Sequence, residues 1–382
     1  MKPLSVGVVG CGNISDLYFQ AGTRFDAFNI IACTDLNREL AEEKAELYEI
    51  PRVLSTDELL ADPNIAMVLN ITQPKAHAEI AMRAVAAGKH LYNEKPLTPE
   101  RAEGRKLLNC ARRKGVRVGC APDTVLGAGV QTARKLIDDG WIGTPVSATA
   151  FMMCHGHESW HPNPEFYYEM GGGPMFDMGP YYLTALVTLL GPVAHVSAVT
   201  RTTFKKRLIT SQPKKGKKIT VETPTHLTGL IEFENNVVCT MITSFDVWHT
   251  GLPCIEIHGT EGSLSVPDPN GFGGEVKVFR PGYEDWQSVP HTHGYADQSR
   301  GIGLADMAAA IQRKRKHRAN GELSYHVLDV MHAFLDGGDS HRQVVVKSTC
   351  KRPEPMPMLL PDGQVEVPRR KRSAKRKAKG SQ

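Results

Sequence analysis

The sequence predicts two domains: an α/β domain with a doubly wound, mainly parallel sheet, and an α+β domain with an open, mostly antiparallel sheet. In the first third of the 382 residues, short apolar runs alternate with helical patterns, which is typical of βαβ units. After Pro122, strand-like alternation of apolar and polar residues dominates. We therefore assign residues 1–122 to the first domain, residues 123–350 to the second, and residues 351–382 to an extended segment with a basic tail.

The first domain is expected to alternate five strands with five helices. The strands are expected at Leu4–Val9, Ile30–Thr34, Ala66–Ile71, His90–Asn93 and Val116–Cys120. The helices are expected from about Asp16, and over Asn37–Tyr48, Asp57–Leu60, Lys75–Ala87 and Thr98–Arg113. Ser55 is a suitable N-cap for the short third helix, and Thr98 for the last one, with Pro99 at its first helical position.

The second domain is expected to be rich in strands, with a few helices between them. The strands are expected at Val146–Met153, Val193–Thr200, Leu227–Phe233, Val237–Thr243, Ile255–His258, Ser263–Val266 and Val276–Phe279. The helices are expected near Gly129–Asp138, Gly179–Leu190, Leu304–Gln312 and Tyr325–Leu335. Asn235-Asn236 favours a tight hairpin turn, and the lysine-rich stretch Lys205–Lys218 is expected to be a solvated loop.

Composition excludes several classes of protein. No apolar run reaches the ~18 residues of a membrane span, and the N-terminus lacks the pattern of a secretory signal. The eight cysteines are scattered without a C-x-x-C pair, so we expect reduced thiols and a cytoplasmic protein. The net charge is +5, but Arg369–Lys379 alone holds eight Lys or Arg residues and no acid. We expect a disordered solubilising tail there and no dedicated nucleic-acid site.

A glycine-rich turn, Gly10-Cys11-Gly12-Asn13-Ile14-Ser15, joins the first strand to the first helix. Its glycines allow the backbone to approach a pyrophosphate, which the helix N-terminus attracts. Asp35 follows the second strand, 23 residues beyond Gly12, where an acid binds the ribose hydroxyls of NAD and repels a 2′-phosphate. The pattern predicts a Rossmann dinucleotide-binding domain that prefers NAD, although Arg38 leaves NADP open.

Two further motifs carry chemistry. Glu94-Lys95-Pro96 follows a strand at the carboxyl edge of the predicted parallel sheet, where ligands bind in such folds. Beside a positively charged nicotinamide, we expect the pKa of Lys95 to be lowered. The run Gly171–Tyr182 holds Asp177 and Tyr181 four residues apart, which predicts two side chains on one face of a helix.

Together these three motifs resemble the glucose–fructose oxidoreductase / inositol dehydrogenase / MocA (Gfo/Idh/MocA) family. The order and spacing agree over about residues 4–350. Further matches are Thr72-Gln73-Pro74 with His77, Trp141-Ile142-Gly143, and His258-Gly259-Thr260-Glu261-Gly262. The resemblance implies a dinucleotide-binding domain followed by a substrate domain, whose sheet often pairs subunits into dimers or tetramers.

The resemblance also implies roles for individual residues. Lys95 matches the catalytic lysine of the family, and Asp177 matches its aspartate. The family commonly has His four residues later, whereas this chain has Tyr181, as does the branch similar to glucose–fructose oxidoreductase. A tyrosine can exchange the alcohol proton if a nearby cation lowers its pKa. A second departure is Pro122-Asp123-Thr124-Val125, where many relatives have Asn or Arg followed by Phe.

The segment from Cys154 to Tyr168 is rich in histidines and aromatic residues, which suit a sugar pocket. A metal site at His155, His157 and His161 is a rival interpretation, but hydride transfer needs no metal, and we assign none. Arg300 and Trp248-His249 are weaker candidates for the same pocket. The residues assigned to the substrate are Lys95, Asp123, His155, His157, Trp160, His161, Tyr168, Asp177 and Tyr181. The residues assigned to the cofactor are Gly10, Gly12, Asn13, Ile14, Asp35, Arg38, Thr72, Pro74, His77, Glu94 and Lys95.

The sequence therefore predicts an NAD(P)-dependent dehydrogenase acting on a secondary hydroxyl or ketone of a sugar or cyclic polyol. Tyr181, helped by Lys95 and Asp177, would exchange the alcohol proton. A first alternative keeps the cofactor tightly bound and exchanges oxidation between two sugars, or cleaves glycosides by transient oxidation. An extra N-terminal arm over the cofactor would favour this alternative, whereas the sequence starts only a few residues before its expected first strand. A second alternative is a non-enzymatic NAD-dependent sensor with a nucleic-acid-binding tail.

Overall fold

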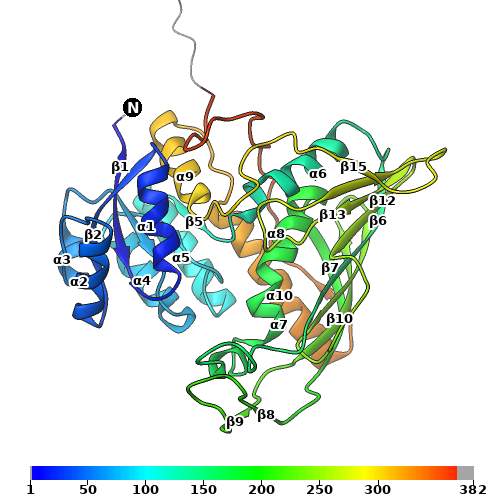
Figure 1. The fold of residues 1–382 in the computed structure, drawn as a ribbon, viewed down its shortest axis with the longest axis horizontal. Helices are drawn as coiled ribbons and strands as arrows, with labels where there is room; N and C mark the ends of the chain where they lie inside the picture. Colours follow the sequence, from blue (N-terminus) through cyan, green and yellow to red (C-terminus); the bar gives the residue numbers. More distant parts are fainter. Residues whose placement is uncertain (1, 368–382) are drawn as a thin grey trace, which may run out of the picture.

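The computed structural model describes residues 2–367 as two sheets at opposite ends of the molecule, with helices between them (Figure 1). The first sheet is parallel, with strand order β2-β1-β3-β4-β5, which confirms the predicted doubly wound domain. Its strands are β1 (Leu4–Val9), β2 (Phe28–Thr34), β3 (Met67–Asn70), β4 (His90–Asn93) and β5 (Val118–Cys120). Every residue of β3 is buried, as expected for a parallel strand covered on both faces.

Five helices connect these strands. They are α1 (Ser15–Arg24), α2 (Arg38–Leu47), α3 (Thr56–Ala61), α4 (Pro74–Ala86) and α5 (Arg101–Lys114). The predicted cap of α3 is confirmed, because Ser55 and Glu58 exchange hydrogen bonds as a capping box. The predicted start of α5 is wrong: the Thr98 hydroxyl donates to the carbonyl of Glu100 instead of accepting from a helical N–H, and the helix begins later at Arg101.

The second sheet has nine strands in the order β15-β14-β13-β12-β6-β11-β10-β7-β16. Its strands are β6 (Pro145–Met153), β7 (Val193–Arg201), β10 (His226–Phe233), β11 (Val238–Ser244), β12 (Ile255–Gly259), β13 (Gly262–Val266), β14 (Val276–Phe279), β15 (Gln287–Val289) and β16 (Val344–Val345). Within it β6 and β11 pair in parallel and the other neighbours are antiparallel, which confirms a mostly antiparallel sheet. The expected hairpin between β10 and β11 turns at Asn236, whose φ is 67°.

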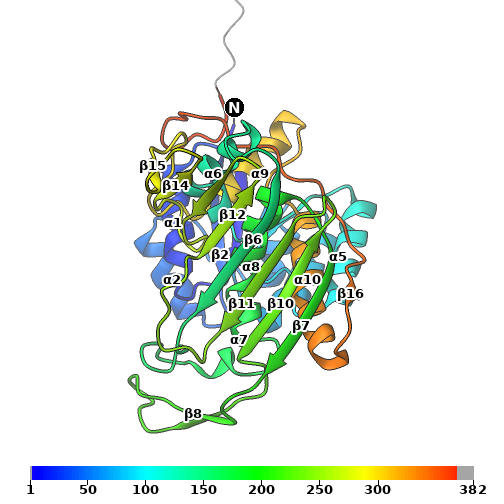
Figure 2. The same cartoon turned by 90° about the vertical axis from the view of Figure 1, so that its right-hand side faces the viewer.

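One face of the large sheet is packed and the other points outward. The helices α6 (Ala128–Asp138), α8 (Gly179–Leu190) and α10 (Gly321–Ser340) lie behind it, and Figure 2 shows the opposite face without a covering helix. Outward positions along the strands include the exposed side chains of Val199, Leu230 and Val238. The helix α9 (Ile302–Arg313) instead packs near β5 of the parallel sheet.

Several short elements differ from the expectation or were not predicted. The lysine-rich stretch is not simply a solvated loop: β8 (Lys206–Leu208) and β9 (Lys218–Thr220) form a hairpin. Arg207 lies buried in it because its guanidinium pairs with Glu158 and Asp246. Two 3-10 turns, η1 (Thr124–Leu126) and η2 (Glu165–Tyr167), and the short helix α7 (Gly173–Asp177) were also not predicted.

The basic segment Arg369–Lys379 lies outside the described residues. Within residues 2–367, no helix combines the length and the hydropathy that a membrane crossing requires.

Candidate active site

The glycine turn forms an open cradle between β1 and α1. Gly10 has a φ of 105°, and a Cβ there would lie 2.9 Å from the carbonyl oxygen of Ile71, so this position requires glycine. A Cβ at Gly12 would meet nothing within 4 Å, so the turn is open on that side. No side chain caps the N-terminus of α1 at Ile14. The turn therefore fits the phosphates of a dinucleotide, which helix N–H groups and the positive end of the helix dipole attract.

Asp35 lies beside this cradle at the end of β2. Its two carboxylate oxygens accept hydrogen bonds from the backbone N–H groups of Cys11 (2.7 Å) and Asn37 (2.9 Å). These bonds tie the acid to the glycine turn, where a carboxylate fits a ribose hydroxyl. Arg38 is exposed, and its Nε donates to Glu42 at 2.7 Å.

The loops after β3 and β4 are joined by a buried histidine. The ring nitrogens of His77 lie 2.7 Å from the carbonyl oxygen of Pro96 and 2.9 Å from that of Thr72. Burial lowers the pKa of His77. The side chain of His77 is fully buried and holds the two loops together, and the cofactor contact expected of it stays a prediction. Pro74 opens α4 at the same edge.

Glu94 connects Tyr18, Arg300 and the backbone of Lys95. One carboxylate oxygen accepts from the hydroxyl of Tyr18 at 2.9 Å and lies 3.4 Å from Nη1 of Arg300. The other accepts from the backbone N–H of Lys95 at 2.8 Å. Glu94 is itself buried, so its role is to hold Lys95 and Arg300 in place.

Lys95, Asp177 and His157 form a cluster between the two domains. The Lys95 ammonium donates to Asp177 Oδ1 at 2.8 Å and to the carbonyl oxygen of Asp177 at 2.7 Å. The other carboxylate oxygen of Asp177 accepts from His157 Nε2 at 2.9 Å. These side chains are mostly buried, which makes the pairing stronger than a surface ion pair.

The electrostatics of this cluster overturn one expectation. Burial disfavours the charged form of Lys95, but the carboxylate of Asp177 outweighs it and raises the pKa of Lys95 above its usual value. Burial likewise opposes ionisation of Asp177, yet the Lys95 ammonium and the His157 hydrogen bond hold the pKa of Asp177 well below its usual range. The expected lowering of the Lys95 pKa is therefore wrong for the free protein, because its partner is a carboxylate.

Tyr181 joins this cluster from the next helix. Its ring centroid lies 5.2 Å from the Lys95 ammonium, and its hydroxyl lies 3.5 Å from Nη2 of Arg300. Asp177 and Tyr181 do not share one helix as predicted, because Met178 both ends α7 and begins α8. Both side chains nevertheless contact Lys95 across this break.

Asp123 is fully buried, with Oδ2 accepting from the backbone N–H groups of Gly301 (2.9 Å) and Gly303 (3.0 Å). Burial raises the pKa of Asp123. This carboxyl therefore fixes the backbone next to Arg300. The substrate contact expected of Asp123 stays a prediction.

The histidine-rich segment contributes aromatic surface around the cluster. His155 stacks on the exposed Trp248 with ring centroids 3.4 Å apart, and Trp160 is also exposed. His161 Nδ1 accepts from the backbone of Asn163 at 3.0 Å. Within residues 2–367 no three His, Cys, Asp or Glu side chains are placed to hold a metal.

Tyr168 does not face this site. Its side chain is fully buried, and its hydroxyl donates to Glu158, which also pairs with Arg207. Tyr167 instead packs its ring against His157 at 4.2 Å between centroids. The structure therefore places Tyr167, and not Tyr168, beside the Lys95 cluster, and the substrate contact expected of Tyr168 stays a prediction. Which of the two tyrosines points toward the cluster could not be predicted, because the segment has neither the period of a strand nor that of a helix.

Two family models match the chain. The model described as an oxidoreductase family with an NAD-binding Rossmann fold matches residues 4–121. The model of the GFO/IDH/MocA C-terminal domain matches residues 130–265.

Curated relatives share modest identity with this chain. An uncharacterized oxidoreductase of Schizosaccharomyces pombe is 29% identical over 208 residues, or 52% of this chain and 55% of that protein. The chain thus spans about half the length of the first curated relatives it matches. A levoglucosan dehydrogenase of Pseudarthrobacter phenanthrenivorans is 26% identical over 292 residues, or 69% of this chain and 73% of that protein.

Solved structures share the fold over nearly the whole chain. A levoglucosan dehydrogenase in complex with NADH and levoglucosan has a TM-score of 0.77 at 22% identity, covering 91% of this chain and 100% of that one. An NAD-binding oxidoreductase from Klebsiella pneumoniae has a TM-score of 0.79 at 23% identity, covering 90% and 99%.

Proposed function

Because this chain belongs to the Gfo/Idh/MocA family of NAD-binding oxidoreductases, we propose that it is a dehydrogenase that oxidises a secondary alcohol of a sugar or cyclic polyol, or reduces the matching ketone. The observation that carries the proposal is the convergence of Lys95, Asp177 and Tyr181 at the carboxyl edge of the parallel sheet. Ligands bind at this edge in doubly wound folds, next to the glycine turn.

The residues of the cluster support a division of labour during proton transfer. Lys95 is held protonated by Asp177, so it donates a hydrogen bond to the substrate oxygen and is not the base. Tyr181 accepts the alcohol proton in its phenolate form, which the neighbouring cations Lys95 and Arg300 stabilise, and it becomes the neutral phenol as the proton is transferred. A nicotinamide bound at the glycine turn would supply the acceptor for the hydride of the alcohol carbon. Asp177 and His157 fix the orientation of Lys95.

The side chains around the Lys95 cluster indicate the substrate class. Exposed aromatic faces at Trp160 and Trp248 suit stacking on a sugar ring, and His155 and His161 supply polar contacts. The relatives named as levoglucosan dehydrogenase and D-xylose dehydrogenase act on carbohydrate, as their names state. A monosaccharide or anhydrosugar is therefore the substrate class we propose.

The cofactor we propose is NAD rather than NADP. Asp35 is held at the turn where a 2′-phosphate would stand, and its negative charge repels one. Arg38, which could have received that phosphate, is paired with Glu42.

We also propose a homodimer or homotetramer assembled through the outward face of the large sheet. Val199, Leu230 and Val238 expose apolar side chains on neighbouring strands of this face, and their burial would favour association. Light scattering coupled to size-exclusion chromatography measures the molar mass in solution. The mass of the Leu230→Lys variant should shift toward that of the monomer, and a wild-type protein that is itself monomeric contradicts the proposal.

The direct test of the activity is a substrate screen. Purified full-length protein is mixed with NAD or NADP and a panel of aldoses, anhydrosugars and inositols, while NADH absorbance is followed. We expect turnover with at least one carbohydrate, faster with NAD, and a kcat/KM lowered by about a thousandfold in Lys95→Met. Absence of turnover with every member of the panel, in protein that binds NADH, contradicts the proposed function. Retention of NAD through dialysis, with transfer between two sugars, would favour a tightly bound cofactor instead.

A further inference from the structure

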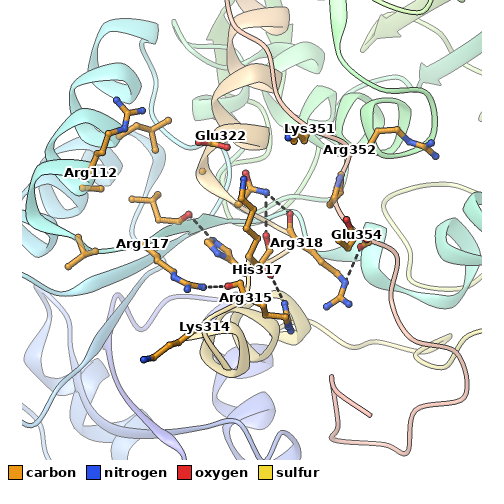
Figure 3. Close-up of a pocket in the computed structure, with 18 residues that line it drawn as sticks. Arg112, Arg117, Lys314, Arg315, His317, Arg318, Glu322, Lys351, Arg352 and Glu354 are labelled. Carbon is orange, nitrogen blue, oxygen red and sulfur yellow. Dashed lines mark hydrogen bonds between the residues drawn. The ribbon is translucent and has the colours of Figure 1, made fainter. Parts of the chain in front are cut away.

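A cavity of about 480 Å³ lies away from the candidate active site (Figure 3). It is formed by the end of α5, the start of β5, the connection between α9 and α10, and the segment that follows β16. Lys95 and the glycine turn follow the carboxyl ends of β4 and β1, whereas this cavity includes Arg117 and Val118 at the amino end of β5. Because the sheet is parallel, the two sites lie at opposite edges of it.

The cavity is strongly cationic. Of the 18 residues that line it, eight are Lys or Arg, and two, Glu322 and Glu354, are acidic. Figure 3 shows these basic side chains arriving from several separate segments of the chain. This excess of positive over negative side chains differs from the surface of a typical charged helix, where acidic and basic residues pair along the helix.

Some of these cations already have acidic partners. Arg315 and Arg318 both bind the buried carboxylate of Asp306, and Arg352 pairs with Asp138 at 2.9 Å. The other five have no carboxylate within 4.0 Å in the described part of the chain. They are Arg112, Arg117, Lys314, Lys316 and Lys351.

Arg117 is the most constrained of the unpaired cations. It is half-buried, and its Nη1 donates to the carbonyl oxygen of Arg315. Burial and the neighbouring positive charge of Arg315 both lower the pKa of Arg117. The cations of this cavity therefore repel one another, and a bound anion would relieve that repulsion.

Part of the remaining wall is apolar and offers a surface for the rest of a ligand. Leu108, Ala111, Val116 and Val118 line the cavity beside the cations. Arginine side chains bind phosphate oxygens through two parallel N–H groups, and lysines add point charge. Cations from several segments around one space suit a ligand with more than one negative charge.

We propose that this cavity binds a phosphorylated small molecule carrying at least two negative charges, at a site separate from the dehydrogenase site. The phosphate groups contact Arg117 directly before β5, Lys314 from the α9–α10 connection and Lys351 from the C-terminal segment. The proposal does not depend on the proposed dehydrogenase activity, because its ligand and its residues are different.

The test is calorimetric titration of the full-length protein with inorganic tripolyphosphate, repeated with citrate. The pocket variant combines Arg117→Gln, Lys314→Gln and Lys351→Gln. The control variant combines Lys205→Gln, Lys206→Gln and Lys215→Gln, which removes the same charge from exposed lysines at the β8–β9 hairpin. We expect one saturable site in the wild type, affinity reduced by about tenfold or more in the pocket variant, and a change of about twofold or less in the control.

Three results overturn the proposal: no saturable binding, equal weakening in both variants, or citrate binding as tightly as tripolyphosphate. If the pocket variant unfolds at a lower temperature than the wild type, the single exposed change Lys351→Glu replaces it. That variant should bind tripolyphosphate several-fold more weakly than the wild type, and unchanged affinity in it also overturns the proposal.

Discussion

The glycine turn and the Lys95 cluster lie at the same edge of the parallel sheet but are built in different ways. The turn and Asp35 come from one βαβ unit, and the hydrogen bond from Cys11 to Asp35 spans 24 positions of the sequence. The bond from Lys95 to Asp177 spans 82 positions and joins two domains. Cofactor recognition thus depends on local backbone geometry, whereas the proposed chemistry depends on ion pairs that exist only when the domains are packed together.

The largest expected effect comes from breaking the cluster at its ammonium group. Lys95→Met should lower kcat/KM by about a thousandfold, because the substrate oxygen loses its charged hydrogen-bond donor. Steady-state kinetics with the substrate found in the screen measures this. Lys75→Met is the matched control, because Lys75 also forms an ion pair between the domains, with Glu169, but is exposed. We expect it to change kcat/KM by about twofold at most, and equal losses in both variants would refute a special role for Lys95.

The next largest effect is a difference in kcat between variants of the two tyrosines near the cluster, Tyr181 and Tyr167. Tyr181→Phe should lower kcat by about a hundredfold, with little change in KM, because only the proton acceptor is removed. Tyr167→Phe should change kcat by about threefold at most, because burial raises the pKa of Tyr167 to about 12 and the tyrosine packs against His157. Larger losses in Tyr167→Phe than in Tyr181→Phe would move the proton acceptor to Tyr167.

Much of the fold and the local part of the site could be predicted from the sequence. The strands of the parallel sheet, the glycine turn and the capping box of α3 depend on neighbouring residues, so their patterns are complete in short windows. The raised pKa of Lys95 could not be predicted, because it is set by Asp177, which the topology brings from another domain. The break at Met178 interrupts an apolar segment that otherwise has helical spacing.

Long-range packing also decided which polar residues are inside. Arg207 appeared as one of several cations in a solvated stretch, but Glu158 and Asp246, from segments on either side of it, bury it. Tyr168 belongs to that network, so its side chain does not face the Lys95 cluster. Arg300 lies beside the cluster, where it contacts Glu94 and Tyr181. No sequence motif with a fixed spacing predicts these contacts.

The ion pair between Lys95 and Asp177 should also make the free energy of unfolding depend on pH. Because the pKa of Asp177 is lower in the folded protein than in the unfolded chain, its stabilisation is present above the unfolded pKa of about 3.9 and is lost as the pH falls through the folded value. Asp177→Asn should therefore cost about 2 kcal/mol of unfolding free energy at pH 6, and less toward pH 2. Urea unfolding across this range measures it.

The control for this prediction is Asp16→Asn, which breaks the more exposed pair of Asp16 with Lys44. The cost there should be about 0.5 kcal/mol, because solvent screens the pair. An Asp177→Asn cost that does not change with pH would contradict the ionised state assigned to the cluster.

The smallest expected effect concerns the cofactor side. Asp35→Ala should weaken NADH binding by about tenfold while kcat at saturating NAD stays within about twofold, because the ribose contact lies far from the reacting carbon. Fluorescence titration of NADH measures the binding. Arg38→Gln is the matched control and should leave NADH affinity unchanged. A loss of kcat in Asp35→Ala would show that the two regions are coupled more tightly than their geometry indicates.

A double-mutant cycle on kcat/KM with Lys95→Met and Asp177→Asn tests the central claim most directly, namely that these two residues act as one unit on the substrate. If Asp177 works by holding Lys95 protonated and in place, the double variant should be about as impaired as Lys95→Met alone. Losses that multiply in the double variant would mean that the two groups act independently, and the account of the cluster would be wrong.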